Sequence, residues 1–163
     1  HFQNDPEAAR GLELYREFEN VAVLHTFSKA YGLAALRLGY TVARPDVMEG
    51  LAKVALPFGV TDIAQAAGVA SLAAEPELQE RIDVLLQERN KLEAYLATTD
   101  WDAPLSQANF VWLAAGEETD ALQAHLMSRG IIGRAFSGNG IRISIGSPEA
   151  NEALIEALGS YNR

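Results

Sequence analysis

The sequence contains no cysteine and only three lysines, Lys29, Lys53 and Lys91. The absence of cysteine excludes disulfides, thiolate metal sites and a cysteine nucleophile, and we expect no metal centre. No apolar run approaches the roughly 18 uncharged residues that a membrane span requires, which favours a cytoplasmic protein without membrane contact. A formal net charge of -9 disfavours a nucleic-acid partner, because that binding needs clustered basic side chains.

What is present is the composition of a globular protein. Of 163 residues, 48% are hydrophobic and 21% are charged, which is enough apolar material to bury a core. The chain begins with His1 in place of methionine, and this indicates a piece of a larger protein.

The first hundred residues have the pattern of an α/β domain. A polar segment around Leu12 and Leu14 predicts a short helix, and the β-branched run 21–24 predicts a strand buried on both faces of a mostly parallel sheet. A second apolar run, 36–43, predicts another such strand. Further helices are predicted over 45–56, from Thr61 or Asp62 to Leu72, and over about 20 residues from Pro76.

The helix from Pro76 is amphipathic. Its leucines recur at helical spacing, and charged residues, among them Glu88 and Arg89, are predicted on the opposite side. Beyond it the pattern predicts a small α+β unit, with strands over 110–114, 131–134 and 141–145 and helices over 117–129 and 148–158. We therefore place a domain boundary near 97–103, which separates residues 1–99 from residues 100–163.

Polar side chains with binding chemistry follow the first predicted strand. Thr26, Ser28 and Lys29 come at its end, where open α/β sheets place their ligand sites. Hydroxyls can hold a phosphate, and a lysine can form an imine. Arg37 lies in an apolar run, where an unpaired guanidinium is costly to bury, so we expect an anionic partner for it. From the pattern alone, a loop lysine and a structural ion pair remain the alternative.

The amino-acid sequence around Lys29 resembles that of a known protein family. The sequence from Thr26 to Tyr40, TFSKAYGLAALRLGY, resembles the cofactor-lysine motif of fold-type-I aminotransferases in the histidinol-phosphate aminotransferase branch, and it is closest to the aromatic (phenylalanine) members. The resemblance continues through Pro57-Phe58, 106–112 and 140–149. It implies the end of a large domain that binds pyridoxal 5'-phosphate, a mostly parallel sheet with helices, followed by a small C-terminal α+β domain.

The resemblance also implies a role for each matching residue. Lys29 would form the Schiff base with pyridoxal phosphate and then move the substrate proton, while Thr26, Ser28 and Arg37 would hold the cofactor phosphate. Arg142 would bind the substrate α-carboxylate, although a surface arginine on a strand is the alternative. Arg134 resembles a family position that meets the far end of the substrate. Asn109 resembles the family's asparagine in the small-domain strand, where a ligand role and a structural role, such as bonding to a turn backbone, both stay open. Tyr31 and Tyr40 are expected to pack.

The substrate prediction depends on Phe58. In the histidinol-phosphate enzymes a tyrosine usually follows the matching proline and helps to hold the substrate phosphate from the neighbouring subunit. The phenyl ring of Phe58 cannot donate a hydrogen bond but can pack on an aromatic side chain. We therefore expect transamination between phenylalanine or tyrosine and a 2-oxo acid such as 2-oxoglutarate, in a homodimer with the Pro57–Gly59 loop at or near its interface.

Other functions stay open at this point. Histidinol phosphate is the second candidate substrate, and a lyase or decarboxylase of the same fold could carry the same lysine motif. A different class of answer is an inactive fragment or degenerate relative that serves as a binding module. Several cofactor-binding elements of the family have no match in this chain, so residues 1–163 alone are expected to be inactive.

Overall fold

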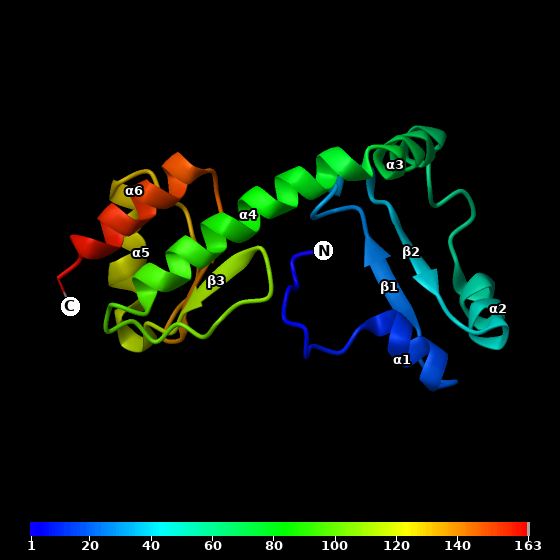
Figure 1. Cartoon of the computed structure of the whole chain (residues 1–163), viewed down its shortest axis with the longest axis horizontal. Coiled ribbons are helices and arrows are strands. Elements are labelled where there is room, and N and C mark those ends of the chain that lie inside the picture. Colours follow the sequence, from blue (N-terminus) through cyan, green and yellow to red (C-terminus); the bar gives the residue numbers. More distant parts are fainter. Residues whose placement is uncertain (163) are drawn as a thin grey trace. The chain divides into compact units, whose positions relative to one another are not determined.

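The computed structural model describes residues 1–162, which divide into two compact units. The first unit comprises His1 and Asp5–Glu80, and the second comprises Phe2–Asn4 and the chain from Arg81 onward. The units divide inside the long helix α4 (Glu75–Leu96; Figure 1), whereas the sequence places a domain boundary after it. Among the described residues, no helix has the length and apolar character to cross a membrane.

The first unit is built from a strand pair and short helices. In chain order its elements are α1 (Gly11–Glu17), β1 (Val23–Thr26), the 3-10 turn η1 (Ala34–Leu36), β2 (Gly39–Val42), α2 (Pro45–Val54), α3 (Asp62–Ala73) and the first turns of α4. Local signals place the helix starts: Pro45 is the first residue of α2, and the Thr61 hydroxyl caps α3 by accepting from the Ala64 amide at 3.2 Å.

Strands β1 and β2, which the sequence assigns to a mostly parallel sheet, pair with each other in the antiparallel direction in the described part of the chain. Val23 pairs with Val42, and Thr26 pairs with Gly39. A parallel pair needs a crossover, usually a helix, and the 27–38 connection contains only η1. The sequence predicts that the 21–24 run is buried on both faces, and among residues 1–162 this is wrong, because exposure alternates along β1 and Leu24 is 76% exposed.

A glycine sets how closely α3 approaches this strand pair. A Cβ atom on Gly68 would lie 2.5 Å from Cδ2 of Leu38 and 3.9 Å from the ring of Phe27. Phe27 is buried there, with the Tyr31 ring 4.5 Å and the Tyr40 ring 6.2 Å from its own. The two tyrosines therefore pack around the residue that precedes Ser28 and Lys29.

The second unit is a three-stranded antiparallel sheet with helices on one face (Figure 1). Its elements after α4 are β3 (Phe110–Leu113), the 3-10 turn η2 (Gly116–Glu118), α5 (Thr119–Ser128), β4 (Arg134–Phe136), β5 (Gly140–Ser144) and α6 (Pro148–Gly159), and the strand order is β3-β5-β4. β4 begins three residues later than predicted, because the chain first closes the C-terminus of α5. The Gly130 amide donates to the Met127 carbonyl and the Ile131 amide donates to the Leu126 carbonyl, with Gly130 at φ 76°.

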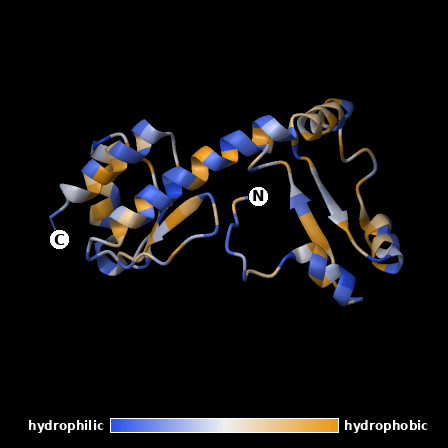
Figure 2. Cartoon of the chain, in the orientation of Figure 1, coloured by the Kyte–Doolittle hydropathy of each residue, from blue (hydrophilic) through white to orange (hydrophobic). Residues whose placement is uncertain are grey.

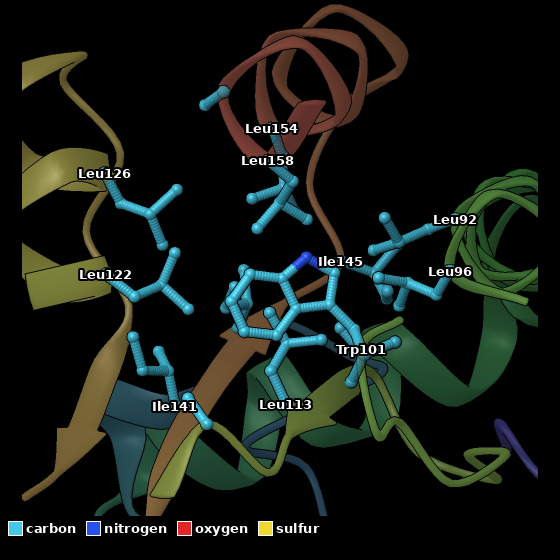
Figure 3. Close-up of a cluster of buried hydrophobic side chains, with 14 residues drawn as sticks. Leu92, Leu96, Trp101, Leu113, Leu122, Leu126, Ile141, Ile145, Leu154 and Leu158 are labelled. Carbon is cyan, nitrogen blue, oxygen red and sulfur yellow. The ribbon is translucent and has the colours of Figure 1, made fainter. Parts of the chain in front are cut away.

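The core of the second unit explains why the units divide inside α4. Figure 3 shows the Trp101 indole among leucines and isoleucines that come from all three helices and from the sheet. Helix α4 contributes Leu92 and Leu96 to this cluster, and both are buried. The second half of α4 therefore belongs to the second unit's core.

Two charged residues of α4 are buried, contrary to the prediction that they face away from the apolar stripe. Glu88 is 4% exposed and Arg89 is 1% exposed. Arg89 is four residues after Leu85 and three before Leu92, so it occupies the apolar stripe itself. Glu88 Oε2 accepts a hydrogen bond from the Asn151 amide at 3.2 Å, and its other oxygen pairs with Lys91.

Candidate active site

Lys29 lies in a tight turn just after β1. The Gly32 amide donates to the Lys29 carbonyl at 2.9 Å, and Gly32 takes φ 71°, a value that glycine adopts without steric cost. One residue on, the Leu33 amide donates to the Phe27 carbonyl at 2.9 Å, which closes the loop onto the buried Phe27. The lysine side chain is exposed, as a group that reacts with a ligand must be.

Thr26, Ser28 and Arg37 line one surface cavity of about 380 Å³ together with Leu24, His25, Leu38 and Gly39. The Ser28 amide donates to the Thr26 hydroxyl oxygen at 3.0 Å, which holds the start of the loop in a turn. Two hydroxyls and a guanidinium around one cavity form a donor set that suits a phosphate. Lys29 follows Ser28 in the chain and lies outside the lining of this cavity.

Arg37 is exposed, so burial within its apolar run is not observed, and neither ion pair found among residues 1–162 includes it; an anionic partner for Arg37 stays a prediction. Its backbone is left-handed, with φ 54° and ψ 43°, and its Nη1 donates to the Ala34 carbonyl at 2.7 Å. A left-handed backbone costs an L-residue other than glycine roughly 1–2 kcal/mol. Such strain concentrates at ligand sites, and Arg37 is among the residues that line the same cavity as Thr26.

The loop has a second support at Tyr31. Its hydroxyl donates to Glu75 Oε2 at 3.2 Å, and the His1 and Tyr31 rings are nearly perpendicular, with their centres 5.1 Å apart. Burial raises the pKa of Tyr31, and the hydrogen bond to Glu75 raises it further. Tyr31 therefore stays a neutral donor at ordinary pH and fastens the loop to the start of α4.

The second unit carries its own candidate residues on one face of its sheet. Arg134 on β4 and Arg142 on β5 lie directly opposite each other, and Trp112 on β3 is opposite Arg142 on its other side. The neighbouring residues Ile141 and Ile143 point to the opposite face and are buried in the core. Like charges directly opposite each other destabilise a sheet, so an anion between them would be favourable.

Aromatic rings surround these two arginines. The Arg142 guanidinium carbon lies 5.3 Å from the centre of the Phe110 ring, and that of Arg134 lies 5.1 Å from the centre of the Phe136 ring. The rings of Trp112 and Phe136 meet edge to face at 5.7 Å. The sequence identifies the two arginines as candidates but not Trp112 and Phe136, although alternation along β3 and β5 predicts that Phe110, Trp112 and Arg142 share a face.

The remaining candidate residues lie outside these two clusters. Asn109 is half-buried just before β3, and its carbonyl accepts from the Ile145 amide at 2.9 Å. Phe58 is fully exposed at φ 57°, in a turn closed by the Gly59 amide and the Leu56 carbonyl at 3.2 Å. A turn of this kind usually has glycine at that position, so Phe58 is held in a strained conformation. No group of three metal-ligating side chains occurs within residues 1–162.

The two-unit architecture, with an α/β first unit and an α+β second unit, is that of the C-terminal part of a fold-type-I aminotransferase. The family model for aminotransferase class I and II matches residues 2–158, and the chain belongs to that family. It is 48% identical over 160 residues to an aromatic amino acid aminotransferase of Thermobifida fusca and 47% identical over 158 residues to one of Cutibacterium acnes.

A solved structure has the same fold. The crystal structure of histidinol-phosphate aminotransferase from Sinorhizobium meliloti in complex with pyridoxal-5'-phosphate superposes with a TM-score of 0.73 at 31% identity, over 86% of this chain and 40% of that one. The matches to the Thermobifida and Cutibacterium enzymes cover 98% and 97% of this chain but 45% of each relative. The chain thus spans about half the length of the curated relatives it matches.

Proposed function

We propose that the full-length polypeptide is a pyridoxal-phosphate-dependent aminotransferase that exchanges an amino group between phenylalanine or tyrosine and a 2-oxo acid such as 2-oxoglutarate. The observation that carries the proposal is the face of the second unit's sheet, where two opposed arginines stand among three aromatic rings. In that enzyme we assign residues 1–99 to the large domain and residues 100–163 to the small domain, and we expect the present chain alone to be inactive.

The donor set of the first unit fits the cofactor. Thr26, Ser28 and Arg37 would hold its phosphate in their common cavity, and Lys29 would bind its aldehyde carbon covalently. When bound, pyridoxal phosphate supplies an electron sink for the charge left at the substrate Cα. In its free form the Lys29 amine would be the base that takes the proton from the substrate Cα. His25, in the strand before this loop, is not needed for that chemistry.

The second unit's sheet face supports a substrate with a carboxylate and an aromatic ring. Arg142 would bind the α-carboxylate through two parallel hydrogen bonds, a geometry that a lysine cannot offer. The rings of Phe110, Trp112 and Phe136 offer apolar surface to an aromatic side chain. Arg134 would then meet the second carboxylate of 2-oxoglutarate when the amino acceptor occupies the site, and Asn109 is a further candidate contact.

The assignment of an aromatic substrate over histidinol phosphate rests on Phe58. A phenyl ring at this position cannot hydrogen-bond a substrate phosphate but can pack against a ring, a contact worth about 0.5–1.5 kcal/mol beyond area burial. The names of the relatives from Thermobifida and Cutibacterium support the same choice. Histidinol phosphate remains the second candidate, because Arg134 could also meet a phosphate.

We also propose a homodimer. Large apolar side chains are exposed along α2, the following loop and α3, where Figure 2 shows hydrophobic residues recurring; the most exposed are Val54, Leu56, Phe58, Ile63 and Val69. Contiguous exposed apolar surface marks a binding interface. A partner subunit that covers this surface would also meet the strained Phe58 turn.

A cytoplasmic location accompanies the proposed function, because the amino acids and 2-oxo acids of metabolism are found there.

The test compares kcat/KM of the full-length enzyme for phenylalanine and for histidinol phosphate, with 2-oxoglutarate as acceptor. The proposal expects phenylalanine to be preferred, and the Phe58→Tyr variant to shift the ratio toward histidinol phosphate. A tenfold preference of the unchanged enzyme for histidinol phosphate would replace the proposal by its alternative. Release of carbon dioxide without a 2-oxo acid product would indicate a decarboxylase, and absence of the cofactor absorption band a non-enzymatic relative.

A further inference from the structure

We propose that Arg89, a buried residue of α4, is a positioning residue for substrate-carboxylate binding. It fixes the 106–110 segment, whose last residue, Phe110, supports the Arg142 guanidinium. The inference rests on the proposed function, since it takes Arg142 as the carboxylate-binding residue. Arg89 belongs neither to the lysine motif of residues 26–40 nor to the sheet face that carries Arg134 and Arg142.

Arg89 occupies an unusual place for a charged side chain. It lies on the apolar stripe of α4 between Leu85 and Leu92 and is 1% exposed. The three oxygens that accept from its guanidinium are uncharged, and its Nε has no hydrogen-bond partner among the described residues. A hydrophobic side chain at such a position is often neutral or more stable, so stability alone does not account for an arginine here.

The guanidinium joins two segments that are far apart in sequence. Nη1 donates to the Phe2 carbonyl at 2.8 Å and to the Ala108 carbonyl at 3.3 Å, while Nη2 donates to the Asn4 side-chain oxygen at 2.7 Å. The Asn4 amide in turn donates to the side-chain oxygen of Gln107 at 2.9 Å. Residues 2–4 and 107–108 are thereby held side by side, and the Arg89 guanidinium bonds to both segments.

One helical turn further along α4, Glu93 secures the start of the same segment. Its Oε1 accepts from the Ser106 amide at 2.7 Å. The Ser106 hydroxyl donates to the Phe110 carbonyl at 2.6 Å and accepts from the Ala108 amide at 3.1 Å. Arg89 and Glu93 therefore hold a closed turn that ends at Phe110.

The turn is connected to the carboxylate site through Phe110. Its ring lies against the Arg142 guanidinium at 5.3 Å, and a cation over an aromatic face gains about 0.5–1 kcal/mol at an exposed site. Displacement of the 106–110 turn would move this ring and change where Arg142 points. An α-carboxylate bound by two parallel hydrogen bonds is sensitive to that direction.

The experiment measures binding of 3-phenylpropanoate, an aromatic carboxylate without an amino group, to the full-length cofactor-loaded enzyme by calorimetry. Asn4→Ala removes an exposed partner of Arg89, and Arg89→Lys keeps the charge but not the fork of donors. We expect the Kd for 3-phenylpropanoate to rise by about fivefold in Asn4→Ala, the scale of one hydrogen bond, and by more in Arg89→Lys. The Kd for pyridoxal phosphate should stay within about twofold of its original value in both variants, on the same scale.

Two control variants separate positioning from loss of stability. Ser137→Ala removes an exposed hydrogen bond to Asp120 of 2.7 Å, and Leu122→Ala opens a cavity in the same core; both should leave the Kd for 3-phenylpropanoate unchanged. Because Arg89 acts through Phe110, adding Asn4→Ala to Phe110→Leu should weaken binding no further.

Equal weakening in Leu122→Ala, additive effects in the double variant, or an unchanged Kd in Arg89→Lys would each overturn the proposal. Failure of the proposed function would look different: the unchanged enzyme would bind 3-phenylpropanoate and respond to these variants but would transfer no amino group. An enzyme that binds no carboxylate at all would overturn both.

Discussion

The guanidinium of Arg142 lies over the ring of Phe110, 5.3 Å from its centre, and both residues belong to neighbouring strands of the second unit's sheet. The ring gives the arginine a fixed apolar support without neutralising its charge. A cation held in this way, opposite a second arginine, is prepared for an anionic ligand, and this is the basis of the first prediction.

Arg37 and Arg142 are predicted to bind different anions. In the full-length enzyme, Arg37→Ala should chiefly raise the Kd for pyridoxal phosphate, because it removes the cation from the cavity that Thr26 and Ser28 line. Arg142→Ala should lower kcat/KM for phenylalanine by about 2–4 kcal/mol and raise KM. Arg129→Ala, an exposed arginine of the same unit, is the control. Equal cofactor loss in both variants, with substrate saturation unchanged, would contradict the division.

Lys29 is predicted to be the covalent anchor and the base. Lys29→Ala should abolish the attachment of pyridoxal phosphate that borohydride reduces and lower kcat by about 10²–10⁴-fold, the scale for loss of a general base. Lys53→Ala is the matched control, because Lys53 is also exposed and its ion pair is with Glu49, at 3.0 Å. A reducible attachment that survives in Lys29→Ala at normal stoichiometry would sink the assignment.

The left-handed backbone of Phe58 is predicted to cost stability, and its ring is predicted to be needed for activity toward phenylalanine. Phe58→Gly should be more stable to denaturant than Phe58→Ala by about 1 kcal/mol, because alanine retains the cost of φ 57° and glycine does not. Both variants should lose catalytic efficiency toward phenylalanine, since both remove the ring. Equal stability of the two variants would show that the turn relaxes and that its strain has no bearing on function.

Glu88 is predicted to make the free energy of unfolding depend on pH. Its hydrogen bond to Lys91 lowers the pKa of Glu88 below its usual value, and the bond from Asn151 adds to this. A carboxyl with a lowered pKa in the folded state contributes stability above the unfolded pKa of 4.5 and loses it as pH falls through the folded value. Glu88→Gln should therefore be less stable than the original at pH 7, and urea titrations should show the difference shrinking below pH 4.5. A difference independent of pH would contradict this.

The helix starts were predictable because their signals are local. Pro45, Thr61 and Pro148 each act on the next turn of backbone, and α2, α3 and α6 begin where these residues place them. The lysine motif is likewise a continuous segment, so its residues were found from the sequence alone.

Features that depend on distant partners were not predictable. The antiparallel pairing of β1 and β2 follows from the shortness of their connection, which an apolar run does not reveal. Arg89 was assigned to the polar side of α4 because its charge outweighed its position in the stripe. Its acceptors, Phe2, Asn4 and Ala108, come from segments that no helical pattern brings together.

The division of α4 between the units matters to anyone who wishes to express the second unit separately. A piece begun at the predicted boundary near residue 100 would omit Leu92 and Leu96 and leave Trp101 partly exposed to solvent. One begun at Arg81 would keep that core but still lack Phe2–Asn4, the short strip of chain that Arg89 bonds. The second unit is thus discontinuous in sequence, and a piece designed to carry its whole core and its buried hydrogen bonds must include Phe2–Asn4 as well as the chain from Arg81.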